Sequence, residues 1–168
     1  NSKPNRFETG DVLIGLQSSG LHSNGFTKVR EIFKNEFRKE FIQPTNIYLE
    51  TILDLNEKFS IHGMMHITGG AYTKLKGVLG NNDALINKNH SLEPQQIFYD
   101  IYKKWIRDEE MHKMFNCGIG FVFSVVKKDA EKCLTEINGF KSDVIGNVIP
   151  GSGKVIIASK FSNKKVVF

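Results

Sequence analysis

The sequence predicts an α+β domain in which helices cover a mixed β-sheet. Short apolar runs alternate with amphipathic stretches, and the late part of the chain is rich in strand-like runs. No internal repeat or low-complexity segment interrupts this pattern. With 168 residues, of which 40% are hydrophobic, the chain is long enough to bury one core. We therefore expect residues 1–168 to form a single domain.

The first half of the chain is predicted to hold three strands and three helices. Residues 12–16 form an apolar run bounded by turn formers, which is typical of a buried strand. Further strands are expected at 62–67 and 83–87, and a short helix at 71–79. Two longer helices are marked by apolar side chains at helical spacing: Phe26, Val29, Phe33 and Phe37, and then, from near Thr45, Tyr48, Ile52, Leu55 and Phe59.

The second half begins with the clearest predicted helix, at about 95–106. Its apolar stripe consists of Ile97, Phe98, Ile101, Tyr102 and Trp105. One or two helical turns at 109–114 and an apolar strand at 121–126 follow. A helix is then marked by Ala130, Cys133, Leu134 and Ile137, and closing strands are expected at 144–149, 155–158 and 165–168.

Composition narrows the class of protein. The net charge is +5, but the lysines are scattered and no basic stripe interleaves with aromatics, so nucleic acid is not the expected partner. No apolar run is long enough to cross a membrane, and the polar first ten residues lack a signal-peptide segment. Cys117 and Cys133 are too few for a disulfide scaffold, which favours a reducing, cytoplasmic setting.

The strongest local signal is a loop between the first strand and the first long helix. It is rich in glycine and hydroxyl groups and runs through Ser18, Ser19, Gly20, Leu21, His22, Ser23, Asn24 and Gly25. Glycines let the backbone approach a ligand, and the helix that follows adds a positive dipole, so an anion is favoured there. On composition alone, a plain turn whose helix is capped by Ser23 or Asn24 is equally compatible.

Two further segments are weaker candidates. Thr68, Gly69 and Gly70 follow a predicted strand and precede a helix, and two such loops can converge on one side of a sheet. Asn116 precedes a strand, where its amide can lie near a ligand or simply belong to a bulged strand entry. The neighbouring Cys117 is expected to be a buried, inert thiol.

A metal site is not expected. His62 and His66 are four apart and would share one face of a strand, so two histidines could approach one ion. No companion ligand lies at suitable spacing, and no glutamate stands between them as a metalloprotease helix requires.

Taken together, these segments resemble one family, aminoimidazole ribonucleotide synthetase, which is the cyclo-ligase of purine biosynthesis. The loop from Ser18 to Gly25, with the strand before it, is similar to the opening of that family's second half. The segment 44–48 resembles its Pro-Thr-Arg-Ile-Tyr segment, and 63–70 resembles its His-Xaa-Thr-Gly-Gly loop. The most discriminating match is 110–120, which resembles the block Glu-Met-Xaa-Xaa-Xaa-Phe-Asn-Xaa-Gly-Xaa-Gly. Ile145 to Val148 matches a late Ile-Gly-Xaa-Val strand.

The sequence also departs from the family pattern. Ala71 stands where many members have a third glycine, and Asn46 stands where arginine is common. The Asn-Xaa-Pro-Arg segment that often follows is replaced here, and Lys76 can supply its charge but not the fork geometry of arginine.

The resemblance implies a domain of a larger enzyme. Family members are about twice as long, and their N-terminal half carries most of the ATP and magnesium site and the main homodimer contact. The related reaction converts formylglycinamidine ribonucleotide and ATP into aminoimidazole ribonucleotide, ADP and phosphate. This chain is then a fragment or one piece of a split enzyme, inactive alone, and the runner-up is a non-catalytic phosphate-ligand-binding domain or subunit of a related synthetase.

The resemblance also suggests roles for the candidate residues. The loop from Ser18 to Gly25 would hold phosphate groups of substrate or nucleotide, and Thr68 to Gly70 and Asn116 would line the same cleft. His22 is the candidate proton shuttle or phosphate donor, and capping of the loop is an equally compatible role.

Overall fold

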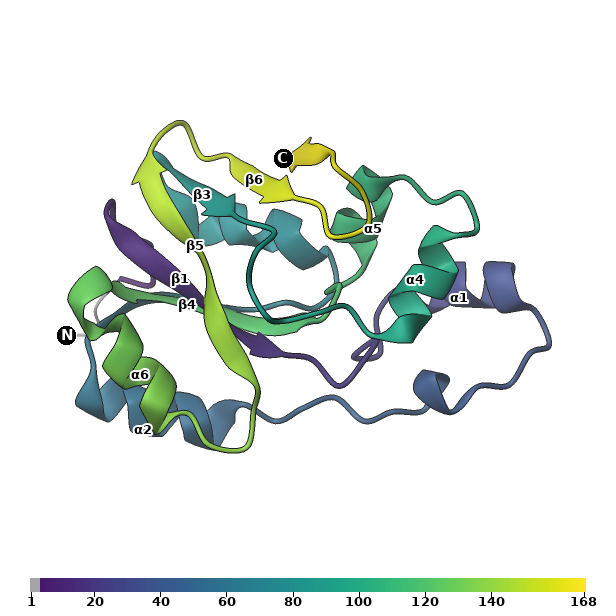
Figure 1. Ribbon diagram of the computed structural model, residues 1–168, viewed down its shortest axis with the longest axis horizontal. Coiled ribbons are helices and arrows are strands. Elements are labelled where there is room, and N and C mark those ends of the chain that lie inside the picture. Colours follow the sequence, from purple (N-terminus) through teal and green to yellow (C-terminus); the bar gives the residue numbers. More distant parts are fainter. Residues whose placement is uncertain (1–3) are drawn as a thin grey trace.

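A computed structural model describes residues 4–168 as helices packed on both faces of one seven-stranded sheet (Figure 1). The strand order is β2-β4-β1-β5-β3-β6-β7, and every pairing is antiparallel except that of β3 with β6. The predicted mixed sheet and α+β class are therefore confirmed. The strands are β1 (Asp11–Gln17), β2 (Ile61–His66), β3 (Asn82–Ile86), β4 (Ile119–Val126), β5 (Ser142–Pro150), β6 (Val155–Ala158) and β7 (Lys165–Val167).

The α-helices are α1 (Phe26–Phe33), α2 (Leu49–Lys58), α3 (Lys76–Leu79), α4 (Gln96–Tyr102), α5 (Asp108–Met114) and α6 (Ala130–Glu136). Short 3₁₀ helices are η1 (Lys39–Phe41), η2 (Ala71–Leu75) and η3 (Lys127–Asp129). Within residues 4–168, none of these helices has the length and apolar character needed to span a bilayer.

Two hydrophobic clusters, one on each face of the sheet, hold the layers together. Along β1, Leu13 joins the larger cluster and Ile14 joins the smaller one, as the two-residue period of a strand requires. Side chains from α1, α3, α4 and α5 complete the larger cluster, whereas α2 and α6 cover the smaller one. Figure 1 shows α2 and α6 together on one side of the sheet. Both faces of the central strands are therefore buried.

Three helices are shorter than their sequence patterns predict. α1 ends at Phe33, because Lys34 adopts a positive φ of 49°, and Phe37 is 74% exposed. α4 ends at Tyr102, and Trp105, with φ of 62°, is 95% exposed instead of completing the buried stripe. α2 begins at Leu49 rather than near Thr45. In each case an apolar side chain that fits the helical period lies outside the helix, since periodicity does not report where a backbone turns away.

Candidate functional site

The first glycine-rich loop joins β1 to α1 through an unusual backbone. Gly20 and Gly25 have φ values of 150° and 70°, and the non-glycine residues His22 and Ser23 have values of 52° and 57°. Non-glycine residues rarely adopt a left-handed conformation, and each such residue costs on the order of 1–3 kcal/mol. The surrounding contacts must therefore hold this loop in place.

Asn116 supplies the central contacts. Its Oδ1 accepts hydrogen bonds from the Ser18 hydroxyl at 2.8 Å and from the Gly118 amide at 2.9 Å. Its Nδ2 donates to the Gly20 carbonyl at 2.7 Å. Asn116 and Ser18 are almost fully buried. The hydrogen bonds of Asn116 and Ser18 thus connect the first glycine-rich loop to the segment that leads into β4. That Asn116 also contacts a ligand stays a prediction.

The His22 side chain of this loop is buried, and its imidazole ring is neutral. Its Nε2 accepts a hydrogen bond from the Ser19 amide at 3.0 Å, which places the proton of the neutral ring on Nδ1. The ring is 3% exposed, and Nδ1 has no hydrogen-bond partner among the described residues. Burial, together with the nearby His66, lowers the pKa of His22 to about 4. His22 can therefore donate a hydrogen bond at neutral pH but cannot supply a positive charge.

His66, at the end of β2, was considered from the sequence only as one of a pair of possible metal ligands, and the structure places it beside His22. Its ring centroid lies 6.1 Å from that of His22 and 5.6 Å from that of Tyr48. Its Nε2 is also buried and has no hydrogen-bond partner within residues 4–168, and burial, with a smaller contribution from Lys74, lowers the pKa of His66. A Cβ on Gly120 would lie 2.0 Å from the Tyr48 hydroxyl and 2.6 Å from a ring carbon of His22. The glycine at 120 is therefore what allows these rings to approach β4.

The expectation that His62 and His66 share a face is wrong. An irregularity in the β2–β4 register between Ile61 and Gly63 displaces His62, whose Nδ1 lies 2.9 Å from an Asp11 carboxylate oxygen. His66 instead contacts Tyr48 and Phe121. Within residues 4–168, no group of three or more His, Cys, Asp or Glu side chains is arranged to hold a metal ion.

The second loop lies beside the first. A Cβ built on Gly69 would lie 3.5 Å from the Asn24 side-chain oxygen, so the two loops are in near contact. Gly70 has φ of 84° and immediately precedes η2, and the Lys74 ammonium donates to the Thr68 hydroxyl at 2.6 Å. The two strand-to-helix junctions thus converge, as their positions in the sequence led us to expect.

A groove of about 640 Å³ opens where Gly25 and Gly70 meet. Its other lining residues are Thr27, Lys28, Glu31, Thr73, Arg107, Glu109, Glu110, Lys113 and Met114. Three basic and three acidic side chains balance one another, so the groove carries no strong formal charge of its own. The groups in this groove best suited to bind an anion are the backbone amides at the start of α1.

The start of α1 carries no side-chain cap. Gly25 is the N-cap residue, the Asn24 side-chain Nδ2 donates to the His22 carbonyl, and no side chain of the described residues accepts from the first amides of the helix. The first helical hydrogen bond runs from the Val29 amide to the Gly25 carbonyl, so the three preceding amides have no helical acceptor. The alternative in which Ser23 or Asn24 caps this helix is therefore wrong. A Cβ on Gly25 would lie 2.2 Å from the Phe115 ring, which explains the glycine there.

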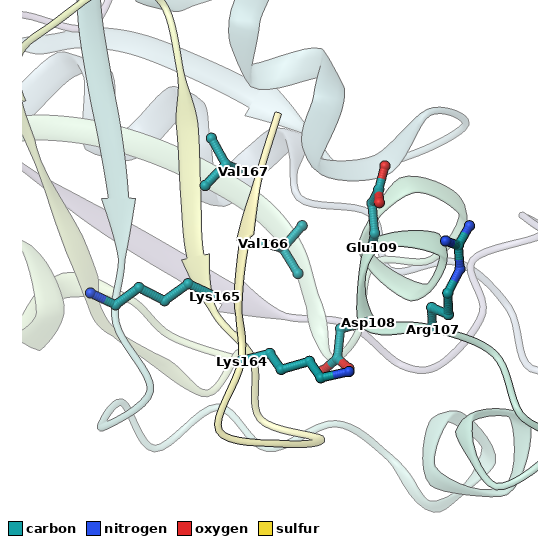
Figure 2. A pocket seen from close by; sticks show the side chains of 7 residues that line it. All are labelled: Arg107, Asp108, Glu109, Lys164, Lys165, Val166 and Val167. Atoms are coloured by element: carbon teal, nitrogen blue, oxygen red, sulfur yellow. The ribbon is translucent and has the colours of Figure 1, made fainter.

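Two further cavities lie outside this groove. One of about 400 Å³ is lined by Thr45, Asn46, Ile47, Tyr48, Leu49, His66 and Phe121. The other lies between α5 and β7 (Figure 2) and has no lining residue from either glycine loop. Its Asp108 carboxylate already accepts hydrogen bonds from the Tyr102 and Ser162 hydroxyls, which indicates a structural role.

The Cys117 thiol agrees with the expected inert role. It is buried next to Asn116, and burial raises its pKa well above the usual range. Both cysteines are buried and unpaired.

Comparison with known proteins decides the family. Residues 8–159 match the family model for the C-terminal domain of AIR synthase related proteins. The chain belongs to this family. It is 39% identical over 165 residues to phosphoribosylformylglycinamidine cyclo-ligase from Clostridium novyi, a match that covers 90% of the chain and 49% of that protein. The same enzyme from Pseudothermotoga lettingae is 42% identical over 166 residues, with 88% and 48% covered.

The chain thus spans about half the length of the curated relatives that it matches. Solved structures of the AIR synthase fold agree with its architecture. E. coli HypE, a hydrogenase maturation protein, superimposes with a TM-score of 0.67 at 16% identity, covering 98% of this chain and 50% of that one. T. maritima PurL complexed with FGAR gives a TM-score of 0.58 at 13% identity, covering 98% and 28%. At such identities these neighbours support the fold alone.

Proposed function

We propose that this chain is the C-terminal domain of the purine-biosynthesis cyclo-ligase that converts formylglycinamidine ribonucleotide and ATP to aminoimidazole ribonucleotide, ADP and phosphate. The observation that carries the proposal is the convergence of the two glycine loops at the uncapped start of α1. The name shared by the curated relatives, phosphoribosylformylglycinamidine cyclo-ligase, supports a substrate that carries a phosphoribosyl group.

In this proposal, the loops position the substrate rather than activate ATP. The backbone amides at the start of α1 receive a phosphate group, because they lack helical acceptors and lie at the positive end of the helix dipole. Gly20, Ser23, Asn24 and Gly25, with Thr68, Gly69 and Gly70, surround that group. Ser18, Ser19 and Asn116 hold the first loop in its ligand-binding shape.

His22 contributes a neutral donor. Its lowered pKa makes it unsuited to neutralising phosphate, whereas its Nδ1 proton can bind a neutral acceptor such as an amide oxygen. In the proposed reaction, the amide oxygen of the substrate takes the terminal phosphoryl group of ATP. A substrate nitrogen then attacks the activated carbon, the ring closes and phosphate leaves. Positioning and charge stabilisation carry such phosphoryl chemistry.

ATP and magnesium are assigned mainly to the other half of the protein. Residues 4–168 offer no cluster of three or more metal-ligating side chains. Magnesium, when bound, neutralises the charge of the transferred phosphoryl group. We further propose that the complete protein is a cytoplasmic homodimer and that this chain has no turnover alone.

The test compares two glycine variants in the complete protein. Gly20→Val adds a side chain to the first loop, where the nearest atoms to the new Cβ are Gln43 carbons at 4.0 Å. Gly139→Val is the matched control, since Gly139 also has a positive φ, of 82°, and no atom of the described residues lies within 4 Å of a Cβ added there. We expect Gly20→Val to abolish formation of aminoimidazole ribonucleotide and the control to retain it, with circular dichroism confirming both folds. Full activity of a folded Gly20→Val protein would refute the proposed substrate site.

A further inference from the structure

The outer face of α2 carries large apolar side chains that nothing in the described chain covers. Leu49 and Leu53 on α2 are 63% and 54% exposed, and Ile47, two residues before the helix begins, is 82% exposed; we call these three residues the α2 stripe. Leu49 and Leu53 are four residues apart and so lie on one side of the helix. An adjoining side of α2 buries Ile52 and Leu55 against the sheet. The stripe is therefore not required for packing this domain.

The stripe continues into the candidate site at one end. Ile47 and Leu49 line the cavity of about 400 Å³ that also contains Tyr48, His66 and Phe121. A protein domain bound to the α2 stripe would therefore cover the open side of this cavity.

The other end of α2 meets the residues that lead into the domain. Asn56, three residues after Leu53, lines a second cavity of about 420 Å³ together with Pro4 and Asn5. Asn5 bonds the β2 edge through its side chain, accepting from the Met64 amide at 2.7 Å, and the Arg6 amide donates to the His62 carbonyl at 2.9 Å. Pro4 and Asn5 therefore lie beside the C-terminal end of α2.

The rim of the stripe has a defined charge. The exposed side chains of α2 include Glu50, Asp54 and Glu57 against the single basic residue Lys58, in a chain whose net charge is +5. Apolar contact surrounded by charge is the usual anatomy of a protein interface. The matching surface should accordingly be apolar at its centre and basic at its edge.

We propose that the α2 stripe is the docking surface for the half of the protein that precedes this domain in its curated relatives. Three features support this occupant: the relatives have about twice the length of this chain, Pro4 and Asn5 lie beside α2, and the stripe borders the candidate site. The inference rests on the two-half arrangement of the proposed function and is independent of the reaction catalysed.

Cysteine labelling tests the docking surface directly. Because Cys117 and Cys133 are 5% and 0% exposed, a new surface cysteine is the only accessible thiol expected in the described chain. Leu53→Cys reports on the stripe, and Phe37→Cys is the matched control at another exposed apolar position. Maleimide reaction rates are compared between the 168-residue chain and the complete protein, or the complex of the two halves where these are separate chains.

We expect Leu53→Cys to react at least about tenfold more slowly in the complete protein, because an interface core excludes water, and Phe37→Cys to react equally in both. Equal rates for Leu53→Cys would overturn the proposal. Protection in the 168-residue chain alone that rises with its concentration would overturn it in favour of a second copy. Protection only after a nucleotide is added would overturn it in favour of a ligand. A separate turnover assay distinguishes failure of this inference from failure of the proposed function, since labelling requires no activity.

Discussion

Asn116→Asp is the most informative single substitution in this domain. The change preserves the shape of the side chain and leaves one oxygen to accept hydrogen bonds from Ser18 and Gly118. It replaces the Nδ2 donor, 2.7 Å from the Gly20 carbonyl, with a second oxygen. An unsatisfied buried carbonyl costs about 1–3 kcal/mol, and the facing carboxylate adds a buried charge, so we expect a loss of about 3 kcal/mol in the free energy of unfolding at pH 7.

Urea unfolding followed by circular dichroism measures this loss, with Asn138→Asp as the control. The Asn138 amide is exposed and bonds the Glu136 carbonyl at 3.2 Å, so its replacement should change stability by no more than about 0.5 kcal/mol. Burial and the facing carbonyl should raise the pKa of the new carboxyl at 116 above that of an unfolded aspartate. The deficit should therefore shrink as the pH falls and the carboxyl gains a proton that it can donate to Gly20. A loss below about 1 kcal/mol at pH 7 would refute the assignment of Asn116 as the residue that holds the loop.

Three further predictions concern the protonation of His22, the glycine at position 25 and the activity of the 168-residue chain alone. The pKa of His22 is lowered from 6.5 to about 4, so the unfolded chain binds more protons than the folded chain between these two pH values. The free energy of unfolding should therefore fall by up to about 3 kcal/mol as the pH drops through this window. Urea unfolding at pH 7 and pH 4 measures the fall, which should be smaller for His22→Gln. Gly25→Ala should cost about 2–3 kcal/mol, because φ is 70° and the added Cβ meets Phe115, whereas Gly77→Ala in α3, with nothing within 4 Å, should be neutral or stabilising in thermal unfolding. The 168-residue chain alone should neither hydrolyse ATP nor form aminoimidazole ribonucleotide, and turnover above a protein-free blank would contradict the assignment of the ATP site to the other half.

The sequence was most informative where a local pattern and a buried surface coincide. Both faces of β1 are covered, and its continuous apolar run at 12–16 predicted that strand closely. The helix stripes were less reliable at their ends. Phe37 and Trp105 continue the spacing of α1 and α4, but the left-handed residues Lys34 and Trp105 turn the backbone away. Helical periodicity predicts which side chains would share a face of a helix, but it does not predict the residue at which the backbone leaves the helix.

The candidate site divides in the same way. Hydroxyls and glycines in the loop from Ser18 to Gly25 are a local signal, so the loop could be found from the sequence. The arrangement around His22 could not, because it depends on residues that only the sheet brings together. The bulge in β2 turns His62 toward Asp11, leaves His66 beside His22, and thereby separates two histidines that a regular strand would have placed on one face. Gly120 then permits His22 and Tyr48 to approach β4. The sequence shows that a glycine stands at this position but not which side chains pack against it. The neutral donor at His22 is thus a product of strand pairing, whereas the anion-binding character of the loop is a product of its own composition.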